Sequence, residues 1–240
     1  MRFTEPLVPG TLVLREKRFL AHVRLADGQQ VIAHTNNTGA MRGCSTPGSR
    51  VWLSPAANPK RKLKWTWEII EIADSPASPQ PVMAGINTLL PNKLVHEAVL
   101  AERIPSLRGY DDVRTEVKYG TEKSRIDLLL ERGEDRCWVE VKNVTLVDAD
   151  GGGAFPDSVT ERGRKHLREL AEMARAGDRA VLLWTVQRSD IASVRPADEI
   201  DPKYGEELRR AVKAGLEVMA WRATVGIDGI ELTEELPVVL

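Results

Sequence analysis

The sequence of 240 residues contains only two cysteines, Cys44 and Cys137. Two thiols are too few for the disulfide framework of a small secreted domain, and no second Cys/His pair follows at the spacing of a zinc site. No two of the four histidines are spaced as an H-x-x-x-H pair. These absences exclude a disulfide scaffold and a zinc pattern, so both cysteines are interpreted as free thiols.

Long apolar runs are absent as well. The longest runs, such as residues 180–184, are far shorter than the roughly 20 residues that a membrane span requires. Residues 1–6 show no apolar segment behind a basic one, so no secretory signal is visible. The content of 42% hydrophobic and 29% charged residues is typical of a globular protein. We therefore expect a folded, cytoplasmic protein with no membrane partner.

Net charge is nearly absent over the whole chain but not over its halves. The formal net charge is −1, yet residues 1–82 hold eleven Lys/Arg against six Asp/Glu, which is +5 and leaves −6 for residues 83–240. Such asymmetry suggests that the halves have different tasks. Three prolines within residues 74–81 forbid a helix there and indicate a linker. We predict one domain over 1–82 and another over 83–240.

The first domain is predicted to be a small β-barrel. It contains five short strand-like segments bounded by turn residues. These segments cover residues 12–15, 19–25, 30–35, 51–53 and 65–72. An OB-type barrel has this number of strands, although strand count alone does not separate it from an SH3-like barrel.

The second domain is predicted to mix helices and strands. Apolar residues recur at helical spacing over three segments, and five further segments are strand-like. The helices are expected at 92–101, 160–175 and 204–214, and the strands at 112–119, 125–131, 137–146, 180–186 and 216–220. The first three strands form an antiparallel meander in this prediction. The fold class is therefore α/β, or α+β over the whole chain.

The strand-like segment 137–146 carries an unusual pair of charges. Strand alternation places Glu140 and Lys142 on the same face of an otherwise apolar segment. Burying these charges would cost several kcal/mol unless they are paired or bound to a metal. Asp127 lies 13 residues before Glu140, and a hairpin through Gly133 can bring the two carboxylates opposite each other. A second Glu-x-Lys pair, at residues 116–118, has no such partner carboxylate.

Two carboxylates and a lysine suit Mg²⁺, which binds oxygen ligands and commonly takes only one or two protein carboxylates beside waters and phosphates. The metal, Mg²⁺ or Mn²⁺, would activate water, and Lys142 could neutralise the charge that develops on a phosphodiester. Hydrolysis of a phosphodiester fits this set best. The alternative is an exposed strand face with an ordinary Glu–Lys pair.

Seven motifs follow one another along the chain. They are Arg18-Phe19, His34-Thr35-Asn36-Asn37-Thr38-Gly39, Gly85-Ile86-Asn87-Thr88, Ser124-Arg125-Ile126-Asp127, Glu140-Val141-Lys142-Asn143-Val144-Thr145-Leu146, Phe155-Pro156-Asp157 and Glu161-Arg162-Gly163-Arg164-Lys165-His166-Leu167. Through this series the sequence resembles the sugar fermentation stimulation protein family, SfsA, over essentially its whole length. It departs from the family at Thr35-Asn36, where Cys-Pro is more frequent.

The resemblance implies an N-terminal OB-like domain and a C-terminal domain similar to the PD-(D/E)XK nucleases. The core of that nuclease fold runs helix, three-strand meander, helix, strand, which is the order predicted above. On the nuclease pattern, Asp127, Glu140 and Lys142 match the catalytic residues, and Asp127 and Glu140 would bind the metal. Glu97 matches a further acidic metal ligand on the first helix of some branches, with a solvent-facing helix residue as the alternative.

Candidate nucleic-acid contacts occur in both domains. The first group is a cationic segment before a tryptophan, and OB surfaces combine such charges with base stacking. It consists of Lys60, Arg61, Lys62, Lys64 and Trp65. The second group, Arg162, Lys165 and His166, is placed on the non-core face of its helix. The alternatives are a solvated turn before a core tryptophan and an ordinary solvated helix face.

The sequence thus predicts a nucleic-acid-binding protein, with DNA as the expected partner, that contains a Mg²⁺-dependent phosphodiesterase (nuclease) site. The alternative is a non-catalytic DNA-binding regulator that retains the nuclease fold, because the SfsA family is described as DNA-binding and linked to sugar metabolism genes. A structural adaptor is a third, weaker alternative. Nucleases that cut both strands often act as symmetric pairs, so a homodimer is one alternative for the oligomeric state.

Overall fold

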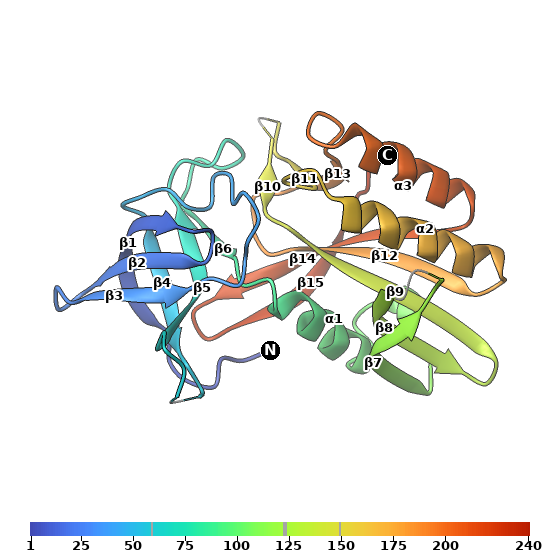
Figure 1. Ribbon diagram of the computed structural model, residues 1–240, viewed down its shortest axis with the longest axis horizontal. Coiled ribbons are helices and arrows are strands. Elements are labelled where there is room, and N and C mark those ends of the chain that lie inside the picture. The colour runs from blue at the N-terminus through green and yellow to red at the C-terminus, as the bar shows by residue number, and fades with distance from the viewer. Residues whose placement is uncertain (59, 122–123, 149) are drawn as a thin grey trace.

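The computed structural model describes residues 1–58, 60–121, 124–148 and 150–240. The chain forms a β-barrel and a larger lobe of sheet and helices, which lie side by side (Figure 1). The fold is therefore α+β, with the barrel first, as predicted.

Five strands close the barrel. They are β1 (Val8–Glu16), β2 (Leu20–Leu25), β3 (Gln30–His34), β4 (Arg50–Pro55) and β5 (Trp65–Ile72). Their order is β1-β2-β3-β5-β4 and back to β1, and the closing pair β3–β5 is parallel. A five-stranded barrel closed in this way is OB-like. Alternation along β5 turns Trp67 fully into the barrel core, whereas Trp65 is half-buried at its edge.

A sixth strand connects the barrel to the larger lobe. Strand β6 (Val82–Gly85) pairs antiparallel with β5, and Gly85 N–H donates to the carbonyl of Gln187 in the other lobe. No described residue of the proline-rich segment 74–81 lies in a strand or helix. The predicted division between residues 82 and 83 falls inside β6, a strand that touches both lobes.

The larger lobe is built on a six-stranded mixed sheet. Its elements are α1 (Leu90–Leu100), the 3-10 turn η1 (Pro105–Leu107), β7 (Asp112–Tyr119), β8 (Ser124–Arg132), β9 (Asp135–Val144), β10 (Leu146–Val147), β11 (Gly152–Phe155), α2 (Glu161–Arg175), β12 (Arg179–Val186), β13 (Ser193–Pro196), α3 (Pro202–Lys213), β14 (Glu217–Gly226) and β15 (Gly229–Leu236). The strand order is β15-β14-β12-β9-β8-β7, with β9, β12 and β14 parallel to one another.

Helices cover both faces of this sheet. The apolar residues of α2 and α3 pack on one face, and those of α1 pack on the other (Figure 1). Alternation along β9 sends Trp138 to the α2 face and Val139 and Val141 to the α1 face. Glu140 and Lys142 lie two and four residues after Trp138, so their side chains point to the same face of the sheet as Trp138. The helix–meander–helix–strand order places these two charged residues in the centre of the lobe, beneath α2.

Candidate metal site between the barrel and the sheet

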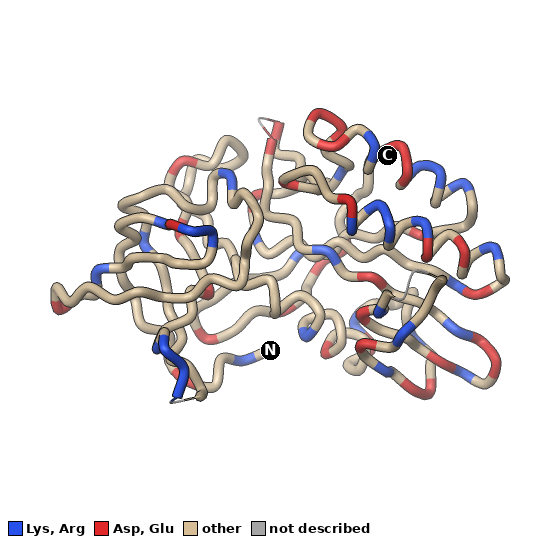
Figure 2. Tube along the Cα trace, viewed as in Figure 1, with Lys and Arg blue, Asp and Glu red and all other residues tan. Residues whose placement is uncertain are grey.

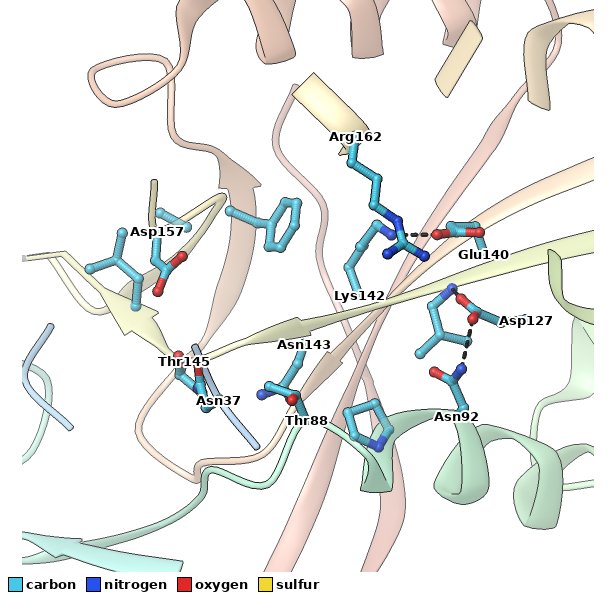
Figure 3. Close-up of a pocket in the computed structure, with 15 residues that line it drawn as sticks. Asn37, Thr88, Asn92, Asp127, Glu140, Lys142, Asn143, Thr145, Asp157 and Arg162 are labelled. Atoms are coloured by element: carbon cyan, nitrogen blue, oxygen red, sulfur yellow. Dashed lines mark hydrogen bonds and ion pairs between the residues drawn. The ribbon is translucent and has the colours of Figure 1, made fainter. Parts of the chain in front are cut away.

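The charged residues of β8 and β9 lie in a cavity of about 390 Å³ (Figure 3). Strand β9 forms its floor, the start of α1 and Arg162 of α2 flank it, and barrel residue Asn37 contributes to one end. The lining consists of Asn37, Thr88, Pro91, Asn92, Asp127, Glu140, Val141, Lys142, Asn143, Thr145, Leu146, Ala154, Phe155, Asp157 and Arg162. Both domains therefore contribute to one site.

Glu140 is almost completely enclosed in this cavity, with 1% of its surface exposed. Its Oε1 atom contacts two donors, Lys142 Nζ from the same strand and Nδ1 of His166 from α2. Its Oε2 atom is buried and has no hydrogen-bond partner among the described residues. A buried carboxylate oxygen without a partner is costly, and a bound cation would satisfy it.

Asp127 lies beside Glu140 because β8 and β9 part at this point. Their pairing runs from Arg132 opposite Asp135 to Leu128 opposite Val139, so Asp127 is the next residue after the paired run. Its Oδ2 accepts the backbone N–H of Val141 at 2.7 Å. Its Oδ1 accepts from Asn92 Nδ2 of α1 at 2.6 Å, and both bonds can be followed in Figure 3. The carboxylate is thereby held in one orientation.

The two carboxylates have opposite pKa shifts. Burial and the neighbouring charge of Glu140 raise the pKa of Asp127 to about 6, although Lys142 and the two hydrogen bonds oppose this. Burial also acts to raise the pKa of Glu140, but the charge of Lys142 and the contacts with His166 outweigh it and hold that pKa below its ordinary value. At neutral pH both groups are therefore ionised, and the charge of Asp127 lowers the stability of the folded protein.

This donor set fits Mg²⁺ or Mn²⁺ better than a metal that needs a full protein cage. Among the residues that the structure describes, no cluster of three or more His, Cys, Asp or Glu side chains could hold a metal. Mg²⁺ does not need one, since it binds through one or two carboxylates and keeps several waters. The unpartnered Oε2 of Glu140 and the adjoining carboxylate of Asp127 supply two hard oxygen ligands of this kind.

Two cationic side chains stand over these carboxylates. Lys142 is 18% exposed and lines the cavity from β9. Arg162 reaches the cavity from the first turn of α2, and its Nε lies 3.4 Å from Nε2 of His166. Figure 3 shows both side chains on the same side of the cavity as Glu140. They are placed to neutralise an anionic ligand bound at the carboxylates.

Glu97 does not belong to this group. Its carboxylate binds the amino group of Met1 at 2.8 Å, and it lines a separate pocket with Arg103 and Glu231. The prediction that it contributes a metal ligand is therefore wrong for this chain. Asn92, five residues earlier on α1, is the residue that reaches Asp127. A helix turns by about 100° per residue, so a ligand expected near the middle of α1 points elsewhere once its first turn faces the strands.

His166 also lies differently from its predicted position. The helical pattern placed it on the solvent face, but it is 5% exposed and its Nδ1 contacts Glu140. A buried imidazole bonded to a carboxylate is not available to phosphate, so its predicted role as a nucleic-acid contact is wrong. The buried face of α2 is wider than its apolar residues indicate, because a charged strand residue lies beneath it. Lys165, on the same helix, is half-buried and does not line the cavity.

The cationic segment of the barrel is separate from the cavity. Lys60, Lys62 and Lys64 are exposed, and Figure 2 shows this run at the lower edge of the barrel. The guanidinium of Arg61 donates to the carbonyls of Leu63 and Trp65. None of the five predicted residues lines the cavity between the domains.

Several residues of the site carried no signal in the sequence that identified them. Asn92, Asn37, Asn143 and Thr88 all line the cavity. Three of them fall within the motifs that carry the family resemblance, at 34–39, 85–88 and 140–146, but uncharged side chains in those motifs gave no reason to assign a role. Asn92 was visible only as the first residue of a predicted helix.

Replacing Asp127 by Asn is expected to stabilise the metal-free protein. Because the folded-state pKa of about 6 lies above the ordinary value of 3.8, the folded protein binds this proton more tightly than the unfolded chain. The contribution of Asp127 to the free energy of unfolding therefore falls as the pH rises from 3.8 to 6 and stays low above pH 6. The total loss from this group is about 3 kcal/mol at most. Denaturation with a metal chelator at pH 8 should show the gain, which should shrink as the pH approaches 4. A variant less stable than wild type at pH 8 would contradict this.

The structure also bears on the membrane. Over residues 1–58, 60–121, 124–148 and 150–240, none of the helices combines the length and apolar character needed to cross a bilayer.

The family models and the related proteins that match this chain point to the same family. The family described as "Sugar fermentation stimulation protein RE domain" matches residues 89–229, and "SfsA N-terminal OB domain" matches residues 13–78. The sugar fermentation stimulation protein homologue of Geobacter metallireducens is 58% identical over 240 residues and covers 100% of both chains. That of Geobacter sulfurreducens is 56% identical over 238 residues, covering 99% of this chain and 98% of its own.

A solved structure agrees with these relatives. The structure of Pyrococcus furiosus SfsA in complex with Ca²⁺ matches with a TM-score of 0.87 and 28% identity, covering 100% of this chain and 98% of that chain. The match extends over the barrel and the larger lobe together. With two matching domains and full-length relatives above 50% identity, the chain belongs to the sugar fermentation stimulation protein (SfsA) family.

Proposed function

We propose that this protein binds nucleic acid, with DNA as the expected partner, and hydrolyses phosphodiester bonds with Mg²⁺ or Mn²⁺ at Asp127, Glu140 and Lys142. The observation that carries the proposal is the buried Oε2 of Glu140, which has no partner in the described part of the chain and lies beside a second carboxylate and a lysine in one cavity. The Ca²⁺ complex of the Pyrococcus furiosus relative supports a divalent cation in this family. The cationic side chains at the cavity support an anionic substrate.

Each residue has a defined part in this reaction. Glu140 and Asp127 would hold the cation, which supplies Lewis-acid activation of water and neutralisation of phosphate charge. His166 and Lys142 fix Oε1 of Glu140, so that Oε2 would be left to bind the cation. Lys142 and Arg162 bind the non-bridging phosphate oxygens as charge develops on them. Water adds its oxygen to phosphorus as one P–O ester bond breaks, one proton passes to solvent, and the departing sugar oxygen takes up a proton.

The experiment is a cleavage assay on labelled single-stranded and duplex DNA and RNA with Mg²⁺, Mn²⁺ or a chelator. Wild type is compared with Asp127→Asn and with Asp135→Asn, whose carboxylate is exposed and pairs with Arg132 away from the cavity. We expect cleavage by wild type and Asp135→Asn and none by Asp127→Asn. Cleavage that survives Asp127→Asn would overturn the proposal. Binding of DNA without metal-dependent cleavage would support the non-catalytic regulator.

The cationic segment of the barrel is proposed as a second nucleic-acid contact. Replacing Lys60, Lys62 and Lys64 by Gln should weaken DNA binding and reduce the slope of log affinity against log salt, by about 0.7–0.9 for each phosphate that is no longer neutralised. Fluorescence anisotropy at several salt concentrations measures this slope. The matched control replaces Lys203, Arg210 and Lys213, three exposed cations of α3, by Gln and should leave the slope unchanged. Equal slopes for the two variants would remove the barrel segment from the binding surface.

A further inference from the structure

A barrel loop borders one end of the cavity, where its residue Asn37 lines the space. This loop, residues 35–41, is joined to the larger lobe on both sides. On the α1 side, Thr88 Oγ1 donates to the carbonyl of Asn36 at 3.0 Å, and Asn36 Nδ2 donates to Asn87 Oδ1 at 2.9 Å. On the α2 side, the N–H of Met41 donates to Asp157 Oδ2 at 3.3 Å. The loop therefore forms an end wall across the cavity.

The end wall is bonded to Arg15 of β1 and packs closely against Asp157. The guanidinium of Arg15 donates to the carbonyls of Asn37 and Gly39, both at 3.0 Å. A Cβ atom on Gly39 would lie 2.6 Å from Asp157 Oδ2, so the loop and Asp157 approach as closely as a residue without a side chain permits. The loop is therefore fixed between the two domains by hydrogen bonds and close packing, and it does not project freely into solvent.

The carboxylates and the end wall lie at opposite ends of the cavity. Figure 3 shows Asp157, Asn37 and Thr145 gathered at one end and Glu140 and Asp127 at the other. Along β9, one residue advances about 3.3 Å, so Glu140 to Asn143 spans about 10 Å. The volume of about 390 Å³ lies near the lower limit of small-molecule sites, about 300–1,000 Å³. This space suits one nucleotide of a single strand and is too small for a duplex.

The space between the two ends offers oriented hydrogen-bond donors. Asn143 Oδ1 accepts from Gln187 Nε2 at 2.8 Å, so its NH₂ group is the part left for a ligand. Asn37 Oδ1 accepts from the N–H of Gly39 at 2.9 Å, which orients its NH₂ group in the same way. Asp157 adds a carboxylate at the wall. A carboxylate repels phosphate but accepts from a hydroxyl, so this end of the cavity suits an uncharged group with a hydroxyl better than a phosphate.

We propose that the cavity receives the end of a single nucleic-acid strand, with the terminal nucleotide between the end wall and the carboxylates. This inference rests on the proposed function and names its substrate: a strand terminus with a free hydroxyl, from which one nucleotide is removed at a time. Water adds to phosphorus and the P–O bond to the neighbouring sugar breaks. The phosphate leaves with the terminal nucleotide, and the shortened strand gains a hydroxyl proton. An internal segment cannot bind in this way, because the wall blocks the chain beyond the terminal unit.

The test compares linear and circular single-stranded DNA of one sequence with Mg²⁺ or Mn²⁺. We expect the linear strand to be shortened to mononucleotides at least about 100-fold faster than the circle is opened. A circle opened at a rate within a few-fold of the linear strand would overturn the inference and leave the proposed function standing. Cleavage of neither substrate would overturn the proposed function and the inference with it.

A variant of the wall provides a second readout. Asn37→Asp keeps the oxygen that accepts from Gly39 and replaces the NH₂ donor by an oxygen. Because Asn37 is 6% exposed and the new charge lies near Asp157, chemical denaturation first checks that the variant is folded. We expect kcat/KM on the linear strand to fall about tenfold or more, the equivalent of about one hydrogen bond or more, with unchanged Mn²⁺ affinity. Gln30→Ala, at an exposed amide on β3, is the control and should match wild type. An unchanged kcat/KM in Asn37→Asp would overturn the role of the wall.

Discussion

Replacing Glu140 by Gln is expected to lower metal-dependent cleavage by about 10³-fold, which corresponds to about 4 kcal/mol of transition-state stabilisation. The amide has one acceptor oxygen where the carboxylate has two. Because Lys142 Nζ and His166 Nδ1 both contact Oε1, the single oxygen of Gln is drawn to Lys142. The NH₂ group then occupies the position of Oε2 and presents hydrogens to the cation. The variant should therefore lose metal affinity together with activity.

The measurement pairs a Mn²⁺ titration with the cleavage assay. The chain supplies its own matched control, because Glu116 and Lys118 form a second Glu-x-Lys pair on β7 in which both side chains are exposed. Glu116→Gln and Lys118→Met should retain both metal binding and cleavage. If Glu140→Gln cleaved at the wild-type rate, the cavity between β8 and β9 would not be the catalytic site.

The second large effect concerns stability. Arg188 follows β12, is 1% exposed and forms a bidentate pair with Asp190, with both N–O distances 2.6 Å. Its Nη1 also donates to the carbonyl of Thr145 at 2.7 Å, and its Nη2 lies 3.3 Å from Ser75 Oγ in the segment between the domains. Burial acts to raise the pKa of Asp190, but the bonds from Arg188 and Ser75 hold that pKa below its ordinary value. The pair is therefore ionised at neutral pH and joins the linker to the larger lobe.

Arg188→Met is expected to lower the free energy of unfolding by about 3–5 kcal/mol, because it leaves the carboxylate of Asp190 buried and unpaired. The double variant with Asp190→Asn should recover part of this loss, since no buried charge remains. Chemical denaturation at pH 7 measures both. The control is Arg209→Met, which removes an equally close but exposed pair with Asp198 and should cost less than about 1 kcal/mol. Equal losses for Arg188→Met and Arg209→Met would refute the buried-pair account.

The sequence predicted most of the secondary structure. All five barrel strands, the first helix, the meander, α2, β12 and α3 lie within a few residues of their predicted positions. These elements depend on local periods of 2.0 and 3.6 residues and on turn residues, which any single sequence displays. The small strands β6, β10, β11 and β13 were missed or merged, because two to four residues are too few to show a period. The eight-residue strand β15 was also not predicted.

The closeness of Asp127 and Glu140 could also be predicted. A hairpin through Gly133 leaves little choice of register once both strands are known, and the strands pair through Leu130 opposite Cys137 as that register requires. Alternation along one strand likewise brings Glu140 and Lys142 together. Contacts within a hairpin are local, so their geometry follows from spacing.

Contacts between distant segments could not be predicted in this way. His166 lies 26 residues from Glu140 and was assigned to the wrong face of α2, because a helical pattern identifies an apolar stripe but not a buried polar contact. Glu97 was assigned to the site and Asn92 was not, because the choice depends on which turn of α1 meets β8. The end wall joins Met41 to Asp157 across 116 residues.

The sequence by itself determined the order of barrel and mixed sheet, the strands that carry the charges and the grouping of Asp127, Glu140 and Lys142. Each of these depends on neighbours along the chain or across one short turn. The tertiary structure alone decided that an oxygen of Glu140 has no partner among the described residues, that His166 is buried against Glu140 and that the barrel residue Asn37 lines one end of the cavity. Those features arise where α2, the sheet and a barrel loop pack together, and packing between distant segments leaves no periodic pattern in the sequence.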